Sequence, residues 1–174
     1  MIGQLKAFNP IGSKRDPQNY TDHQWITEDT LVCSTENGDV LVIDEGELKH
    51  VLPVVIPDGV YCLSAFSRVC ILISEDTEQI QGFIAAGANG YVAAFEKTDD
   101  MEFFTLIRRV QAKKGALGRV VGISVSESEE SAVCCFESRQ IAMMQLSRVE
   151  VAQENDDLFN IMYGGFHNGP ITGM

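Results

Sequence analysis

The side chains in this sequence most able to do chemistry are its three histidines and five cysteines. A histidine acts as a general base when a serine or cysteine nucleophile and an orienting carboxylate lie beside it. His23 and His167 have no local signature of such a nucleophile around them. Each opens a run of β-forming residues, where we expect the imidazole to hydrogen-bond within its own structural unit. The sequence therefore predicts no catalytic residue.

The cysteines do not show the spacing of a metal site. They are Cys33, Cys62, Cys70, Cys134 and Cys135. Their number is odd, they lie in predicted strands and none forms a C-x-x-C pair, which favours reduced, buried thiols in a cytosolic compartment. A zinc site built from His23, Cys33 and Cys62 is compatible with their separation along the chain, but no ligand spacing supports it. We expect no bound metal and no cofactor.

Five other features have a structural and a functional interpretation. The segment 113–118 holds two lysines and two glycines without the spacing of a phosphate-binding loop, and the acids at 154–157 lack the spacing of a calcium loop. We interpret the acidic turn at 127–130 as a solvated tip, with contact to a basic partner as the alternative. Trp25 is expected to pack within the sheet rather than to serve as an exposed binding anchor. Met143 and Met144 are expected to pack, although adjacent residues on a strand face opposite ways.

A repeated turn motif predicts how these residues are positioned. Asn37-Gly38 stands between two β-rich runs, and Asn89-Gly90 does the same about 50 residues later. A weaker copy follows at Ser138-Arg139. The pattern predicts antiparallel hairpins over 30–44, 82–96 and 132–146, with turns at 36–39, 87–90 and 137–140. No window shows an apolar stripe of helical spacing, so helix should be scarce.

A strand-rich repeat of about 50 residues is typical of a propeller. We therefore expect an all-β fold, a partial β-propeller of four-stranded blades. The expected units are the end of a preceding blade and a connector at 1–20, blades at 21–56, 57–112 (with an insertion) and 113–166, and the first strand of a truncated blade at 167–174. Propellers close with roughly 4 to 8 blades, whereas about three are expected here, which would leave an open sheet edge. We therefore expect this piece to aggregate or to be completed by other polypeptide.

Within these units the strand assignments are as follows. The first inner strand is expected at 22–26 and the third at 120–125. In the second unit 60–66 and 69–73 both have β character, so one of them is expected to be an extra strand. Outer strands are expected at 48–55, 103–107 and 158–163. A hydrolase with its site in a central channel would need His, Asp, Glu or Arg on the inner strands, whereas 69–73 and 120–125 are apolar.

Composition excludes several classes of partner. The net charge is −12, with a pI near 4.5, which argues against binding to nucleic acid or to anionic lipid. Residues 1–15 hold no apolar core of signal-peptide length, and the apolar region at 60–74 is too short to span a bilayer. The acidic surface favours solubility and basic partners.

The hairpins also resemble a known family. A third strand ending in an apolar-acidic pair, as in Ile43-Asp44 and Phe95-Glu96, resembles the WD repeat, which ordinarily ends in Trp-Asp. The third copy has Gln145-Leu146 at this place, so the motif is degenerate. The closing stretch from His167 to Gly173 also resembles a WD repeat.

The resemblance is stronger to WD-repeat proteins of cilia and flagella. It rests on Pro17-Gln18-Asn19-Tyr20, on Phe95-Glu96-Lys97-Thr98 and on six single residues between 20 and 44. The six are His23, Trp25, Glu28, Asp29, Thr35 and Gly38. It implies a non-catalytic scaffold of the axoneme that positions inner-arm dynein or regulatory complexes. Direct electrostatic binding to the acidic tails of tubulin is not expected. The alternative is a cytosolic WD-repeat interaction module outside cilia.

Overall fold

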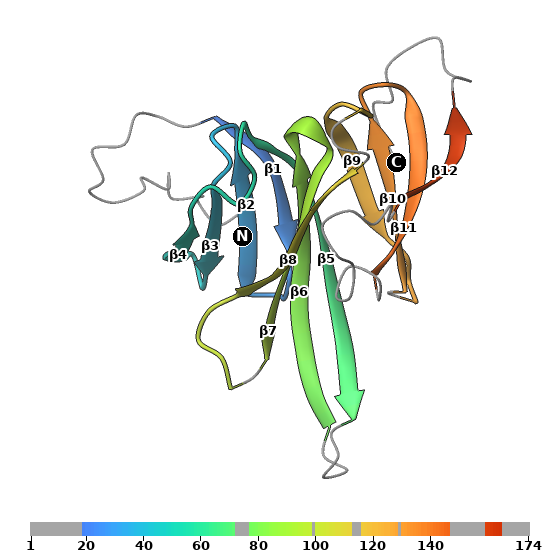
Figure 1. Ribbon diagram of the computed structural model, residues 1–174. Helices are drawn as coiled ribbons and strands as arrows, with labels where there is room; N and C mark the ends of the chain where they lie inside the picture. Colours follow the sequence, from blue (N-terminus) through green and yellow to red (C-terminus); the bar gives the residue numbers. More distant parts are fainter. Residues whose placement is uncertain are drawn as a thin grey trace, which may run out of the picture.

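The computed structural model describes residues 19–71, 77–98, 100–112, 116–128, 130–146 and 159–164. These residues form three four-stranded antiparallel sheets (Figure 1). The expectation of an all-β fold made of propeller blades is confirmed. The segments expected to end a preceding blade and to begin a truncated one lie outside the described residues, apart from Asn19 and Tyr20.

Each sheet is a meander in which consecutive strands pair. The first contains β1 (Tyr20–Trp25), β2 (Thr30–Thr35), β3 (Val40–Asp44) and β4 (Glu47–Leu52). The second contains β5 (Val60–Ile71), β6 (Thr77–Gly87), β7 (Tyr91–Thr98) and β8 (Thr105–Gln111). The third contains β9 (Val120–Val125), β10 (Ser131–Phe136), β11 (Gln140–Gln145) and β12 (Phe159–Gly164). This is the strand order of propeller blades.

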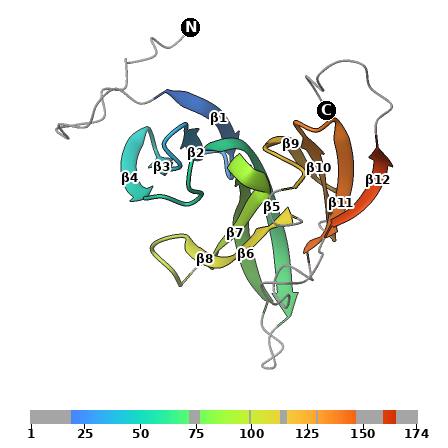
Figure 2. The same cartoon turned by 45° about the horizontal axis from the view of Figure 1, so that its top comes forward.

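The first strands of the three sheets lie next to one another, because β5 contacts both β1 and β9. Figure 2 shows these strands near the middle of the molecule and β4, β8 and β12 at its periphery. One apolar core fills the space between the first and second sheets, around Val32, Ile56 and Phe83. Another fills the space between the second and third, around Ile84 and Phe136. The second sheet is therefore buried on both faces.

The same backbone hydrogen bond ties the start of each sheet to its second turn. The carbonyls of Asn19 and Gly59 accept the N–H groups of Glu36 and Ala88, at 3.1 and 3.0 Å. In the third sheet the carbonyl of Arg119 accepts the N–H of Glu137 at 2.8 Å. The recurrence shows that the three sheets are copies of one unit, although their sequences differ.

The three expected hairpins are present, with turns between Thr35 and Val40, between Gly87 and Tyr91, and between Phe136 and Gln140. The turn geometry differs between copies. In the first copy only Gly38 has a positive φ, so Asn37 and Gly38 do not form the two-residue turn that an Asn-Gly pair favours, in which both residues have positive φ. Both Asn89 and Gly90 have positive φ in the second copy, as the motif predicts.

Three strand expectations are wrong in detail. Residues 60–66 and 69–73 are not separate strands, because β5 runs unbroken to Ile71, and its pairing with β6 continues there. The hairpin thus extends beyond the rest of its sheet (Figure 1). Strand β4 ends at Leu52, since Pro53 has no N–H to donate to a ladder. Strand β8 begins at Thr105, so Phe103 and Phe104 lie in the connection before it.

Helix is confined, among the residues described, to the 3₁₀ turn Ala88–Gly90 and to isolated helical residues at positions 112 and 146. In the same part of the chain no helix is long and apolar enough to cross a membrane.

Candidate functional site

The first inner strand is polar, unlike the other two. Strand β1 carries Thr21, Asp22, His23 and Gln24 between its aromatic ends. The inner strands named as apolar from the sequence are 69–73 and 120–125; β9 is largely apolar, and β1, for which nothing of the kind is expected, is polar. This difference concentrates hydrogen-bonding side chains at the junction of the first and second sheets.

Asp22 is the residue there that sequence reasoning missed. Its carboxylate accepts the backbone N–H of Leu63 on β5 at 2.7 Å and that of His23 at 2.8 Å. Thr21 also donates its hydroxyl to the carbonyl of Val60. At the next junction the hydroxyl of Ser64 accepts the N–H of Val125 on β9 at 3.1 Å. These polar side chains fasten neighbouring sheets at their inner strands.

The proposed zinc ligands do not converge. His23 and Cys33 are cross-strand neighbours in the first sheet, whereas Cys62 lies in the core between the second and third sheets. In the described part of the chain no three His, Cys, Asp or Glu residues are grouped as metal ligands. The structure therefore gives no support to a zinc site at these residues.

Burial keeps the described thiols protonated at neutral pH. It raises the pKa of the Cys134 thiol from 9.0 to about 12, with the neighbouring Cys135 adding to the shift. The pKa of Cys62 is raised further, first by burial and then by the charges of Cys134 and Asp22. Burial and Asp22 also raise the pKa of Cys33. Since the thiolate is the nucleophile and the metal ligand, these cysteines suit packing rather than chemistry.

Trp25 is not packed within the sheet. Its side chain is 56% exposed, so the expectation that it packs is wrong. Trp25 lies opposite Leu31 in the β1–β2 ladder. The adjacent residue Val32 points into the core between the first and second sheets, so Leu31 and Trp25 face the other way. The indole is therefore presented on the face of the first sheet that does not contact the second.

The remaining sequence candidates have structural roles or are not described. Met144 is fully buried in the core between the second and third sheets, and Met143 is half-buried. Glu127 and Glu130 are exposed, as expected of a solvated turn. Residues 113–115, 154–157 and His167 lie outside the described residues.

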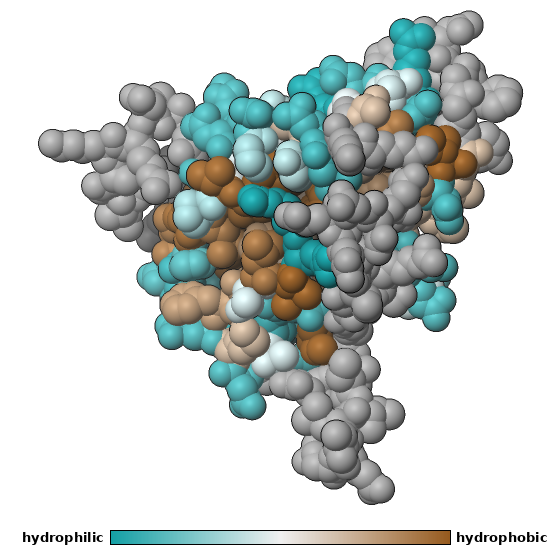
Figure 3. All heavy atoms as spheres, in the orientation of Figure 1, coloured by the Kyte–Doolittle hydropathy of each residue, from teal (hydrophilic) through white to brown (hydrophobic). Residues whose placement is uncertain are grey.

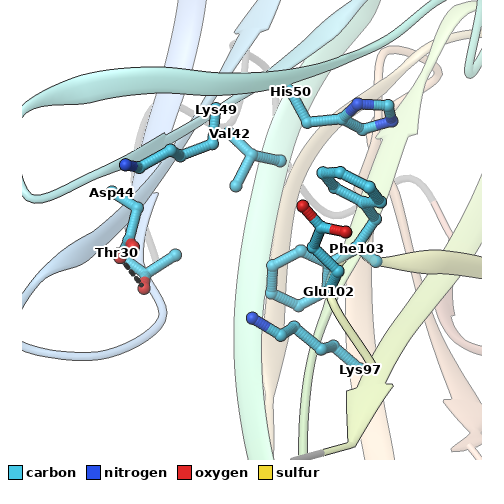
Figure 4. A pocket seen from close by; sticks show the side chains of 9 residues that line it. Thr30, Val42, Asp44, Lys49, His50, Lys97, Glu102 and Phe103 are labelled. Carbon is cyan, nitrogen blue, oxygen red and sulfur yellow. Dashed lines mark hydrogen bonds between the residues drawn. The ribbon is translucent and has the colours of Figure 1, made fainter. Parts of the chain in front are cut away.

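A groove lies between the first and second sheets on the outer rim (Figure 4). Its lining comes from β2, β3 and β4 on one side and from β7 and the β7–β8 connection on the other. The lining residues are Thr30, Val42, Asp44, Lys49, His50, Lys97, Glu102, Phe103 and Phe104. The rings of His50 and Phe103 lie 4.7 Å apart, centroid to centroid, and join the two sides. Neither ring was singled out from the sequence, because the contact joins distant segments.

The polar groups of this groove are partly satisfied by one another. The Thr30 hydroxyl donates to the Asp44 carboxylate at 2.8 Å, and the Lys49 ammonium lies 3.4 Å from the Glu47 carboxylate. Figure 4 shows Lys49 and Lys97 extending to the same side, away from His50. The arrangement offers apolar surface flanked by two ammonium groups, of Lys49 and Lys97, and by the carboxylates of Asp44 and Glu102. It has the chemistry of a binding surface, and neither serine nor cysteine is among its lining residues.

Comparison with known proteins gives one distant relative in sequence and a β-propeller as the similar structure. The chain is 18% identical to "Cilia- and flagella-associated protein 57" of Mus musculus across 99% of its own length, and it spans 17% of that protein. It superimposes on the β-propeller domain of Cps50 (Swd1) from Myceliophteria thermophila with a TM-score of 0.53 and 12% identity. That match covers 76% of this chain and 42% of the other. No protein-family model matches the chain.

The solved structure shows the fold, and the mouse protein shows a distant likeness along nearly the whole chain. Both agree with the WD-type pattern of the hairpins. The described residues fold as blades of a β-propeller, and the chain resembles a cilia- and flagella-associated protein.

Proposed function

We propose that the chain is a non-catalytic scaffold or adaptor of the ciliary axoneme. The observation that carries the proposal is the likeness to "Cilia- and flagella-associated protein 57" along 99% of the chain. The fold supports it, because propeller blades present loops and strand edges to other proteins. The protonated thiols and the lack of converging catalytic groups in the described residues agree with an interaction role. We further propose that the blades correspond to 21–56, 57–112 and 113–166.

The partners we propose are axonemal proteins such as subunits of inner-arm dynein and its regulatory complexes. Charge constrains how the contact is made. With a net charge of −12, the chain is repelled by the acidic tails of tubulin, and like charges brought together at an interface cost several kcal/mol. The contact with the doublet microtubule would therefore be made through other proteins.

Co-precipitation from salt-extracted axonemes tests the partners. A tagged copy of the full chain should recover inner-arm dynein subunits, as identified by mass spectrometry. The purified chain should stay in the supernatant when bare microtubules are sedimented at physiological salt. Recovery of only cytosolic proteins would favour a WD-repeat module outside cilia, and co-sedimentation with bare microtubules would contradict the adaptor mechanism.

A further inference from the structure

Exposed apolar side chains gather on the rim between the first and second sheets. The described residues include nine large apolar side chains that are exposed, and five of them lie in the β4–β5 connection, the β7–β8 connection or β8. The five are Val54, Met101, Phe103, Leu106 and Ile107. Figure 3 shows apolar surface in this region of the molecule. A concentration of this kind marks an interaction site more often than scattered apolar residues do.

Two contacts make the rim one continuous surface. The His50 ring on β4 lies against Phe103 of the β7–β8 connection. One guanidinium nitrogen of Arg109 on β8 donates to the carbonyl of Val55 at 3.4 Å, which joins β8 to the β4–β5 connection. The groove of Figure 4 lies within this surface. We call the five apolar residues together with His50, Lys49, Lys97 and Arg109 the rim surface.

The floor of the rim surface is packed with aromatic side chains. Phe104 is buried and meets the edge of Phe83 with ring centroids 5.3 Å apart. Phe83 stacks in turn on Phe95 at 4.9 Å. A floor that is already packed costs little ordering entropy when a partner binds. Phe103 precedes Phe104 in the chain and has 42% of its surface exposed, as an anchor that a partner can cover.

Charge indicates the chemistry of the partner. The chain as a whole is strongly acidic, yet three of the six Lys and Arg side chains that the structure describes lie on the rim surface. Lys97 has no ion-pair partner among the described residues, and Lys49 shares its charge with exposed Glu47. Asp44 is already held by Thr30, which leaves Glu102 as the lining acid without such a bond. Lys97 is thus the group on the rim surface to which a carboxylate of a partner can pair most directly, with Lys49 as the second.

We propose that the rim surface binds a protein segment that carries both apolar and acidic side chains. The apolar side chains cover Phe103, Leu106 and Val54, and the carboxylates pair with Lys97 and Lys49. This inference rests on the proposed function of the chain as a protein-interaction module. It goes further by naming the surface and the composition of the segment that the surface accepts.

Selection from a phage library of random peptides on the purified full chain tests the proposal. Peptides should be enriched in Leu, Ile, Phe or Met together with Asp or Glu. Phe103→Ser and Lys97→Glu should each weaken the binding of a selected peptide by about tenfold or more, as loss of a central anchor does. Ile161→Ser removes an exposed apolar side chain from β12 in the third sheet and should leave binding unchanged. Circular dichroism melting confirms that each variant is folded.

Three results would overturn the proposal: enrichment of basic peptides, no enrichment at all, or equal binding by the wild type and Phe103→Ser. The selection uses no cilium, so its failure leaves the axonemal role standing. Conversely, a chain absent from axonemes could still select acidic, apolar peptides. The two proposals therefore fail separately.

Discussion

The carboxylate of Asp22 on β1 accepts the backbone N–H of Leu63 on β5 across 2.7 Å and so joins the first two sheets at their inner strands. Ser64 makes the corresponding contact from β5 to Val125 on β9. Both bonds run from a side chain of one sheet to the backbone of the next. They fix how far one inner strand is shifted along its own direction relative to the next, which apolar packing alone would not determine.

Replacing Asp22 with Ala should destabilise the fold. The buried N–H of Leu63 would lose its acceptor, at a cost of about 1–3 kcal/mol in the free energy of unfolding. Asp22→Asn keeps an acceptor oxygen and should lose less stability than Asp22→Ala. It should still be less stable than the wild type, because a charged acceptor forms the stronger bond. Asp29→Ala, at an exposed position, is the control and should change stability by no more than about 0.5 kcal/mol. Urea unfolding measures all three, and equal stability of Asp22→Ala and wild type would contradict the role.

Gly38 and Gly46 form a matched pair with positive φ, at 88° and 80°. A Cβ added at Gly38 would lie 2.0 Å from the carbonyl oxygen of Ile56, whereas one added at Gly46 meets nothing within 4 Å. Gly46→Ala should therefore cost only the backbone strain, about 1 kcal/mol. Gly38→Ala should cost roughly 3 kcal/mol or more, since backbone must move. Equal midpoints in urea unfolding would show that the Gly38 turn does not pack on Ile56.

Trp25 is the only tryptophan in the chain and reports directly on its own surroundings. At 56% exposure its fluorescence should resemble that of free tryptophan and be quenched readily by acrylamide in the native protein. Trp25→Ala should lower the free energy of unfolding by no more than about 0.5 kcal/mol, as at other surface positions. A blue-shifted emission protected from acrylamide would mean that polypeptide covers this face of the first sheet.

Stability should fall in alkaline solution because of Cys134. In the unfolded chain its thiol ionises near 9.0, whereas in the fold the pKa is about 12. Between these values the unfolded state loses the proton first, so rising pH favours unfolding. From about pH 8 to about pH 10.5 the wild type should lose about 2 kcal/mol more than Cys134→Ala does. Urea unfolding of both proteins at the two pH values measures the difference, and parallel losses would contradict it.

The hairpins could be predicted because their signals are local. Asn37-Gly38 and Asn89-Gly90 lie between runs of β-forming residues, and the turns fall at both places. The bounds of β5 could not be predicted, because Ser67 and Arg68 resemble a break, yet their pairing with β6 is continuous. Whether a polar pair ends a strand depends on whether the neighbouring strand continues to pair with it. The sequence of β5 alone does not show this.

The sites were less predictable than the fold. Asp22 and Leu63, like His50 and Phe103, come together only when neighbouring sheets pack. Trp25 was misjudged because a strand pattern does not reveal which of its two faces another sheet will cover. A carboxylate in the middle of an inner strand, as at Asp22, is the one local signal that could have indicated a contact between sheets.

Fractionation of cilia tests the central claim most directly. The full chain, tagged and expressed in ciliated cells, should enter cilia and remain with the axoneme when the membrane is removed by detergent. It should be released by high salt together with inner-arm dynein, because protein contacts rather than lipid hold it there. A chain found in the cytosol, or one that leaves with the detergent-soluble fraction, would contradict the axonemal account.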